Sequence, residues 1–247
     1  VVTIHDLIPI VLPAYRGSLL ARLYTALVSA SARGAQMVLT DSEASRKDIV
    51  ERLGLAPERV RAILLAPGPE FTPDAAPNDD AIRAKYRLPD AYVLYLGGFD
   101  LRKNLRALLS AWTWVVAGGG ESFALVMAGG LPAAGGRVFE DVRAVANGLG
   151  IENSVKFPGA ITPEDLPAVY RGAAAFVYPS RYEGFGLPPL EAMACGVPVI
   201  ACNVSSIPEV VGDAAYLVDP DDARAMGAAI LTVLVEEKVA DDLRERA

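Results

Sequence analysis

From residue 92 onward the sequence alternates short apolar runs with longer segments of helical periodicity. Runs such as Tyr92–Leu96 and Ala174–Tyr178 have the length of buried strands, and turn residues separate them from the helical segments. Strands that alternate with helices are joined as βαβ units, which build a parallel sheet with right-handed crossovers. The sequence therefore predicts an α/β fold with a doubly wound parallel sheet. The expected strands are 92–96, 123–128, 154–157, 174–178, 197–201 and 215–218.

Helices are expected between these strands. One should cover residues 102–117, and another should cover 138–149 after a glycine- and alanine-rich loop. Thr162 is expected to cap the start of the next helix, and Asp221 is expected to cap the last one, because both side chains can accept hydrogen bonds from free N–H groups of a first turn.

The sequence of residues 1–70 predicts a smaller unit with the same alternation of strands and helices. Strands are expected at 1–4, 35–40 and 59–65, and a helix that Ser42 caps and Gly54 ends is expected between the last two. The stretch 19–32 is helical and apolar apart from Arg22; it fits a helix docked on the sheet, while a membrane-surface helix stays open. Four prolines between residues 67 and 77 indicate a boundary between domains 1–70 and 71–247.

Composition narrows the possible partners. The chain of 247 residues has a net charge of −7 and no basic block, so nucleic acid is not expected as a partner. Its apolar runs are shorter than a membrane span, so membrane contact is expected to be peripheral at most.

The chain begins with Val1 inside an expected strand and shows no leader segment, so we expect a piece of a longer protein. Cys195 and Cys202 lie in apolar surroundings and predict buried free thiols in a reducing cytoplasm.

The stretch from Pro179 to Gly196 carries the strongest functional signal. After the expected strand 174–178, Gly184 and Gly186 allow the backbone to approach a ligand closely, and Pro188 and Pro189 favour a first helical turn. A loop that leads from a parallel strand into a helix N-terminus is where anionic ligands bind in α/β sheets. Two carboxylates flank this loop. Glu191 is placed to accept hydrogen bonds from vicinal hydroxyls and Glu183 to face a reacting centre, the alternative being one capping and one solvated acid.

A second motif follows the strand 92–96. The strand ends in Gly97 and Gly98, and two cations, Arg102 and Lys103, stand at the expected start of a helix. Cations at a helix N-terminus oppose the helix macrodipole, and a bound anion would offset that cost. An Arg fork beside a Lys point charge suits a pyrophosphate, although a solvated basic pair is an equal alternative. The dinucleotide fingerprint and the Walker A loop are both absent from the sequence.

The two glutamates, framed by Gly-Phe-Gly-Leu-Pro-Pro and Ala-Met-Ala-Cys-Gly, form a pattern that resembles the retaining glycosyltransferases of family 4, which have the GT-B architecture. The stretch 203–220 is also similar to bacterial mannosyltransferases of that family. The resemblance implies that residues 1–70 are the remaining part of an N-terminal acceptor-side domain. It implies that 71–247 form the domain that binds a nucleotide-sugar donor.

The resemblance also assigns roles. Arg102 and Lys103, after Gly97 and Gly98, should hold the donor phosphates, and Glu191 should hold the ribose hydroxyls. Glu183, with the backbone amides of Gly184, Phe185, Gly186 and Leu187, should hold the donor sugar. The Thr-Ile-His-Asp sequence at residues 3–6 should place His5 near the reacting carbon, the alternative being a structural histidine. Phe157 should border the nucleobase, the alternative being a plain turn.

The expected activity is transfer of a hexose, with mannose as one candidate, from a nucleotide diphosphate sugar to a glycan or lipid-linked hydroxyl with retained configuration. GDP-mannose and UDP-sugars both stay open as donors. No cofactor and no metal ion are expected, since cations of the chain can stabilise the leaving diphosphate. A nucleotide-sugar-binding module without catalysis is the main alternative. A nucleotide-sugar epimerase of the same architecture is a weaker one, because the chain has a single histidine.

Overall fold

We describe the chain from a computed structural model, which describes residues 1–15, 17, 19–131 and 138–247. The chain divides into two compact units. The N-terminal unit comprises Val1–Ala66 together with Tyr182–Gly186 and Ser205–Val210. The C-terminal unit comprises Pro67–Arg181, Leu187–Val204 and Val211–Ala247. The roles expected for domains 1–70 and 71–247 stay predictions.

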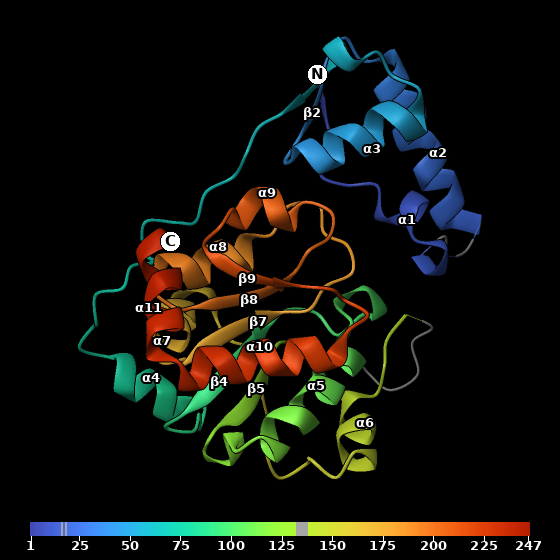
Figure 1. Cartoon of the computed structure of the whole chain (residues 1–247). Coiled ribbons are helices and arrows are strands. Elements are labelled where there is room, and N and C mark those ends of the chain that lie inside the picture. The colour runs from blue at the N-terminus through green and yellow to red at the C-terminus, as the bar shows by residue number, and fades with distance from the viewer. Residues whose placement is uncertain (16, 18, 132–137) are drawn as a thin grey trace. The chain divides into compact units, whose positions relative to one another are not determined.

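The C-terminal unit is built on a six-stranded sheet in which all neighbouring strands are parallel. The strand order is β6-β5-β4-β7-β8-β9, so the chain starts in the middle of the sheet and winds to one edge before it winds to the other (Figure 1). The predicted doubly wound parallel sheet is therefore confirmed. The strands are β4 (Tyr92–Leu96), β5 (Ala124–Ala128), β6 (Val155–Gly159), β7 (Ala175–Tyr178), β8 (Val199–Cys202) and β9 (Ala215–Val218).

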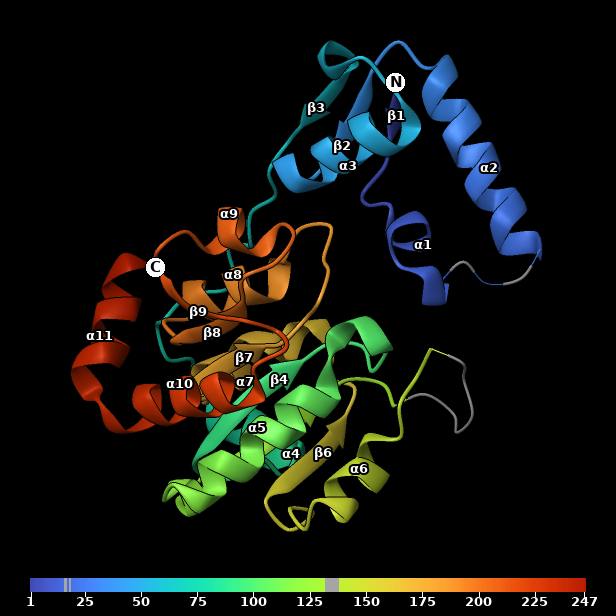
Figure 2. The same ribbon diagram turned by 45° about the vertical axis from the view of Figure 1, so that its right-hand side comes forward.

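Helices cover both faces of this sheet. On one face α5 and α10 pack against each other, and on the other α7 packs against α8, which contacts β7 and β8 (Figures 1 and 2). The α-helices from residue 67 onward are α4 (Asp79–Lys85), α5 (Leu105–Ala117), α6 (Val142–Gly148), α7 (Leu166–Arg171), α8 (Leu187–Ala194), α9 (Ile207–Val211), α10 (Ala223–Val235) and α11 (Glu237–Arg246). Short 3₁₀ turns lie at Leu101–Lys103, Gly120–Ser122 and Pro163–Asp165.

Successive strand residues fill two separate cores. Val93 and Tyr95 of β4 and Val177 of β7 are buried in the cluster that includes α5 and α10. Phe176, between two such positions, packs instead against Tyr170 of α7, with ring centroids 5.5 Å apart. Because neighbouring residues of a strand point to opposite faces, a continuous apolar run is what a sheet covered on both faces requires.

The N-terminal unit holds a smaller sheet of three parallel strands in the order β1-β2-β3. Figure 2 shows these strands with the helices α2 and α3 beside them. Val38, Ile49 and Val60, one each from β2, α3 and β3, belong to its core. The elements are β1 (Val2–Thr3), α1 (Ile8–Val11), α2 (Leu19–Gly34), β2 (Val38–Thr40), α3 (Glu43–Leu53) and β3 (Val60–Ala62), with 3₁₀ turns at Pro13–Tyr15 and Pro57–Arg59.

Helix ends agree only partly with the sequence predictions. Ser42 caps α3 by accepting a hydrogen bond from the Ser45 N–H, and Gly54 ends it at φ 64°, as expected. The predicted cap Asp221 is wrong, because its neighbour Asp222 accepts the bond from the Ala225 N–H of α10.

The predicted Thr162 cap is also wrong. The Thr162 hydroxyl donates to the Asp165 carboxylate at 3.1 Å and makes no capping bond, and a 3₁₀ turn precedes α7. The expected glycine- and alanine-rich loop falls largely on residues 132–137, outside the described residues.

Candidate functional site

Two neighbouring strands bring the two predicted motifs to one edge of the large sheet. β4 and β7 are parallel neighbours, so the loops after Leu96 and after Tyr178 leave the sheet at the same edge. The Arg181 N–H donates to the Arg102 carbonyl oxygen at 2.7 Å, and the Arg181 Nε donates to Asn104 Oδ1 at 3.1 Å. These bonds tie the loop after β7 to the cationic turn after β4. This carboxyl edge is where ligands bind in open α/β sheets.

Arg102 and Lys103 do not stand in the first turn of α5, and that prediction is wrong. They form a 3₁₀ turn, and α5 begins only at Leu105, because Asn104 adopts the left-handed conformation at φ 56° and interrupts the helix. The Asn104 side chain donates to the Pro220 carbonyl oxygen at 2.8 Å, which fixes this break. Arg102 Nε lies 3.2 Å from Asp100 Oδ1, a partner that the sequence analysis had not considered.

Lys103 is buried, with 5% of the residue exposed. Its Nζ donates to the Tyr178 hydroxyl at 2.9 Å and lies 4.8 Å from the centroid of the same ring. The alternative of a solvated basic pair is therefore wrong for Lys103. A buried ammonium group at the carboxyl edge of a parallel sheet is suited to an anionic ligand.

Glycines keep this edge clear of side chains. Gly97 and Gly98 follow β4, and a Cβ on Gly98 would lie 3.2 Å from Asp100 Oδ2. Gly129, which follows β5, has φ 143°, and a Cβ there would overlap the Gly97 carbonyl oxygen. The close approach of these two strand ends therefore requires glycine at 129.

Glu191 lies on α8, one turn after the start of the helix at Leu187. The buried Tyr170 hydroxyl donates to its Oε2 at 2.8 Å, and within the described residues its Oε1 has no hydrogen-bond partner. Burial raises the pKa of Glu191, while the hydrogen bond from Tyr170 acts in the opposite direction. One oxygen is thus held and the other is available to hydroxyl donors.

Phe157 belongs to β6, two strands away from β4, so the alternative of a plain turn is wrong. The guanidinium carbon of Arg143 lies 4.4 Å from the centroid of its ring. Arg143 comes from α6, and nothing in the sequence pattern had pointed to this contact.

The remaining predicted residues lie in the N-terminal unit. His5 follows β1, and its ring is exposed, which excludes a core histidine. Its Nδ1 is 2.7 Å from Oδ2 of Asp41, which follows the neighbouring strand β2. A carboxylate partner of this kind orients an imidazole ring. Asp41 was missed, although its place directly after an expected strand was a usable signal.

Glu183, Gly184, Phe185 and Gly186 form a loop in the same unit. The Glu183 N–H donates to Ser205 Oγ at 2.9 Å, and Ser206 Oγ donates to the Glu183 carbonyl oxygen at 3.0 Å. The hydroxyls of Ser205 and Ser206, which the sequence analysis left unassigned, therefore support this loop. A Cβ on Gly184 would lie 2.9 Å from the His5 carbonyl oxygen, so glycine is required where the loop meets the end of β1.

The structure thus gathers the predicted residues into groups. Gly97, Gly98, Arg102 and Lys103 share the β4–β7 edge of the C-terminal unit, which also contains Phe157, Leu187 and Glu191. His5 and residues 183–186 lie together in the N-terminal unit. Their functional roles stay predictions.

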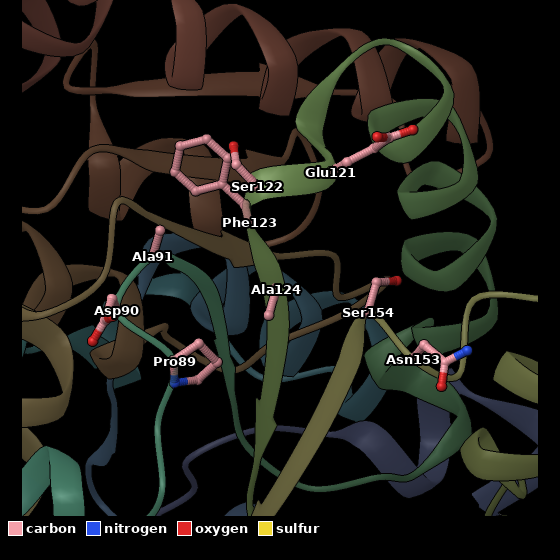
Figure 3. Close-up of a pocket in the computed structure, with 9 residues that line it drawn as sticks. All are labelled: Pro89, Asp90, Ala91, Glu121, Ser122, Phe123, Ala124, Asn153 and Ser154. Carbon is pink, nitrogen blue, oxygen red and sulfur yellow. The ribbon is translucent and has the colours of Figure 1, made fainter.

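A separate hollow of about 450 Å³ lies at the amino ends of β4, β5 and β6, the opposite edge of the sheet (Figure 3). Figure 3 shows Asp90, Ala91 and Ala124 where β4 and β5 begin, with Glu121 pointing away from them. None of the predicted site residues lines it. Since ligands of open α/β sheets bind at the carboxyl edge, this hollow is not the candidate site.

Two features are absent from the described part of the chain. It contains no cluster of three or more His, Cys, Asp or Glu side chains arranged to hold a metal ion. None of its helices combines the length and the apolar character that crossing a membrane requires.

The chain is similar in sequence to known proteins. Residues 78–247 match the family model of the glycosyl transferases group 1. The O-antigen chain mannosyltransferase B of Escherichia coli is 36% identical over 241 residues, which cover 96% of this chain and 61% of that protein.

Solved structures are similar as well. Sucrose-phosphate synthase from Thermosynechococcus elongatus is 28% identical with a TM-score of 0.77, over 99% of this chain and 61% of that one. Anabaena HepE in complex with UDP-glucose has a TM-score of 0.79 at 20% identity, over 99% and 65%. The predicted α/β fold of GT-B type is confirmed by these likenesses. The chain spans less than two thirds of each of the three proteins.

Proposed function

The chain belongs to the group 1 glycosyl transferases, and from this premise we propose that the whole protein transfers a hexose from a nucleoside diphosphate sugar to a hydroxyl group of a glycan or lipid-linked acceptor. We assign it to family 4, with retention of the anomeric configuration. Mannose from GDP-mannose is the transferred sugar in this proposal, because the relative from Escherichia coli is a mannosyltransferase. UDP-glucose, the ligand in the HepE complex, is the competing donor.

The observation that carries the proposal is the junction of the two motifs at the β4–β7 edge. The Arg181–Arg102 backbone bond joins them, and Lys103 is buried beside Tyr178. In the proposed reaction, Arg102 and Lys103 bind the donor diphosphate and stabilise the negative charge that grows on it as the glycosidic bond to the sugar breaks. Charges that are fixed in place before the reaction make this kind of stabilisation effective. They take the role that a metal ion has in other transferases, so the proposed reaction is independent of metal.

Other residues recognise the rest of the donor. Glu191 accepts hydrogen bonds from the ribose hydroxyls, and Phe157 borders the base. Glu183, with the backbone amides of residues 184–187, holds the sugar and stabilises positive charge at its anomeric carbon. His5, oriented by Asp41, faces the same carbon. These assignments rest on the family resemblance together with the positions described above.

The proposed location is the cytoplasm, with peripheral membrane contact at most. The structure has two free cysteines, Cys195 and Cys202, and burial raises their pKa to about 11 and about 12. Such thiols are protonated and unreactive at neutral pH, and unpaired cysteines are typical of a reducing compartment.

A second candidate function is a nucleotide-sugar-binding module without catalysis. The observation that favours it is that this chain spans 61% of its mannosyltransferase relative, whose activity belongs to the longer protein. A turnover assay of a protein of the relative's length beside this chain separates the two functions, because only the transferase produces a glycosylated acceptor.

The proposed phosphate site is tested by calorimetric titration of the chain with GDP-mannose and with UDP-glucose. We expect GDP-mannose to bind more tightly, and Arg102→Ala combined with Lys103→Met to weaken that binding at least about 100-fold, because two charge-assisted contacts are lost. Arg106→Ala is the matched control. Arg106 is exposed on α5, is paired with Glu140, and should leave the affinity unchanged. Unchanged affinity in the double variant would refute the assignment.

A further inference from the structure

A row of aromatic side chains lies beneath the carboxyl edge of the large sheet, on the face that α7 covers. We call Tyr170, Phe176 and Tyr178 the aromatic layer. The rings of Tyr170 and Phe176 meet edge to face with centroids 5.5 Å apart, and those of Phe176 and Tyr178 are stacked at 6.0 Å. All three side chains are buried, with exposed fractions of 2% or less. The layer is therefore a rigid part of the core.

The hydroxyl groups of the two tyrosines in the layer form hydrogen bonds with two charged side chains of the candidate site, Glu191 and Lys103. The Tyr170 hydroxyl donates to Glu191 Oε2 at 2.8 Å, and the Tyr178 hydroxyl accepts from Lys103 Nζ at 2.9 Å. A phenol can make both kinds of bond, because it is at once a donor and an acceptor. A carboxylate and an ammonium group, on different elements, are thus both bonded to the same packed layer.

The bond to Glu191 is the more informative of the two. The Glu191 carboxylate has no other hydrogen bond within the described residues, so the Tyr170 hydroxyl is the polar contact that orients it. Burial also raises the pKa of Tyr170 well above its usual value, which keeps the hydroxyl protonated and able to donate. The remaining oxygen, Oε1, is left for a ligand.

We propose that Tyr170 is a positioning residue for nucleoside recognition: it holds the Glu191 carboxylate so that both ribose hydroxyls can bind to it. This inference rests on the proposed function, in which Glu191 accepts hydrogen bonds from the ribose. A carboxylate that is held before binding loses less rotational freedom when the ribose arrives, and the affinity is higher for that reason.

The same bond favours the ionised form of the carboxylate. Burial and the nearby charge of Glu70 raise the pKa of Glu191, and the Tyr170 hydroxyl lowers it by stabilising the charged form. Removal of the hydroxyl should therefore raise the pKa of Glu191 further. The pH below which nucleotide binding weakens, through protonation of this acceptor, should then move upward.

The test compares GDP and UDP with their 2′,3′-dideoxy analogues in calorimetric titrations of the chain. Tyr170→Phe should weaken the binding of the ribonucleotides about tenfold, the size expected for one hydrogen bond to a charged group, and leave the dideoxy analogues unchanged. Tyr92→Phe is the matched control. Its buried hydroxyl donates to the carbonyl oxygen of Val169, next to Tyr170 in α7, so both variants disturb the same helix. Tyr92→Phe should preserve the preference for ribose.

A double-variant cycle separates positioning from a general effect on packing. If Tyr170 acts through Glu191, Tyr170→Phe should have no further effect on ribonucleotide affinity in a Glu191→Gln background, and its upward shift of the pH limit should also vanish. Additive losses would overturn the positioning role. An unchanged preference for ribose in Tyr170→Phe, with that preference lost in Glu191→Gln, would overturn it as well. If Glu191→Gln itself keeps the preference, the role of Glu191 in the proposed function fails first, and the inference fails with it.

Discussion

The two units bury their helices to very different extents. The helix α10 of the C-terminal unit places Met226, Ile230 and Val233 in the core with exposed fractions of 4% or less. The helix α2 of the N-terminal unit is also rich in apolar residues, yet Leu20 is 76% exposed and Leu27 is 67% exposed. Leu19, Leu23 and Tyr24 are also exposed.

The difference follows from the sheets. Six strands offer α10 a wide apolar face beside α5, whereas three short strands offer α2 a narrow one. Among the described side chains of α2, only Ser29 and Ala32 are buried. Apolar composition therefore does not determine how much of a helix is buried, because burial depends on the area of the partner surface. Because the C-terminal unit has the fuller core, we expect its free energy of unfolding to be the more sensitive to substitution.

The largest effect on stability is expected at a buried ion pair of the C-terminal unit. Arg171 of α7 donates to both carboxylate oxygens of Asp79 in α4, at 2.8 and 2.6 Å, and both side chains are at most 10% exposed. Asp79→Ala leaves the guanidinium buried without its partner and should cost about 3–5 kcal/mol in the free energy of unfolding. Urea titration followed by tryptophan fluorescence measures this, because the two tryptophans, Trp112 and Trp114, both lie in α5.

The same pair gives the C-terminal unit a dependence on pH. The hydrogen bonds from Arg171 hold the pKa of Asp79 below its usual value, so the stabilisation is fully present above the unfolded-state pKa near 4. It is lost as the pH falls through the lower, folded-state value. Asp79→Asn should therefore flatten the acid limb of stability against pH, by at most about 1.4 kcal/mol per pH unit. An unaltered acid limb would show that another group causes the loss.

Substitutions in the two helices test the comparison directly. Ile230→Ala in α10 should lower the free energy of unfolding by about 3 kcal/mol, since it leaves a cavity in the core. Leu23→Ala in α2 should change it by less than about 0.5 kcal/mol, because that side chain is already half exposed. Urea titrations followed by far-ultraviolet circular dichroism measure both. Equal losses would mean that α2 is covered in solution by something other than its own sheet.

The fold was largely predictable from the sequence. β4 and β9 have the predicted bounds, and the parallel order followed from the alternation of strands and helices. Helix starts were less predictable, because a single left-handed residue, Asn104, moved the start of α5 by three positions. Left-handed backbone at a residue other than glycine depends on tertiary contacts, here the bond from Asn104 to Pro220, which no local pattern reveals.

The sequence pattern of glycines, cations and glutamates singled out residues 97–103 and 183–191 as candidates. It did not reveal the side chains that support them. Their partners Asp100, Tyr170 and Tyr178 did not stand out. In the sequence, Tyr170 and Tyr178 resemble ordinary aromatic residues of the core. Their hydroxyl groups form hydrogen bonds with residues that are far away in the sequence. A local sequence pattern can place the apolar part of such a side chain in the core. It cannot predict a hydrogen bond to a residue that is far away in the sequence.

The central claim is that a donor diphosphate binds at the carboxyl edge where β4 and β7 meet. The most direct test is a crystal structure of the chain with GDP. The account predicts that phosphate oxygens lie within about 3 Å of Lys103 Nζ or of the Arg102 guanidinium group. A diphosphate bound instead at the amino edge, in the hollow beside Asp90 and Glu121, would contradict it.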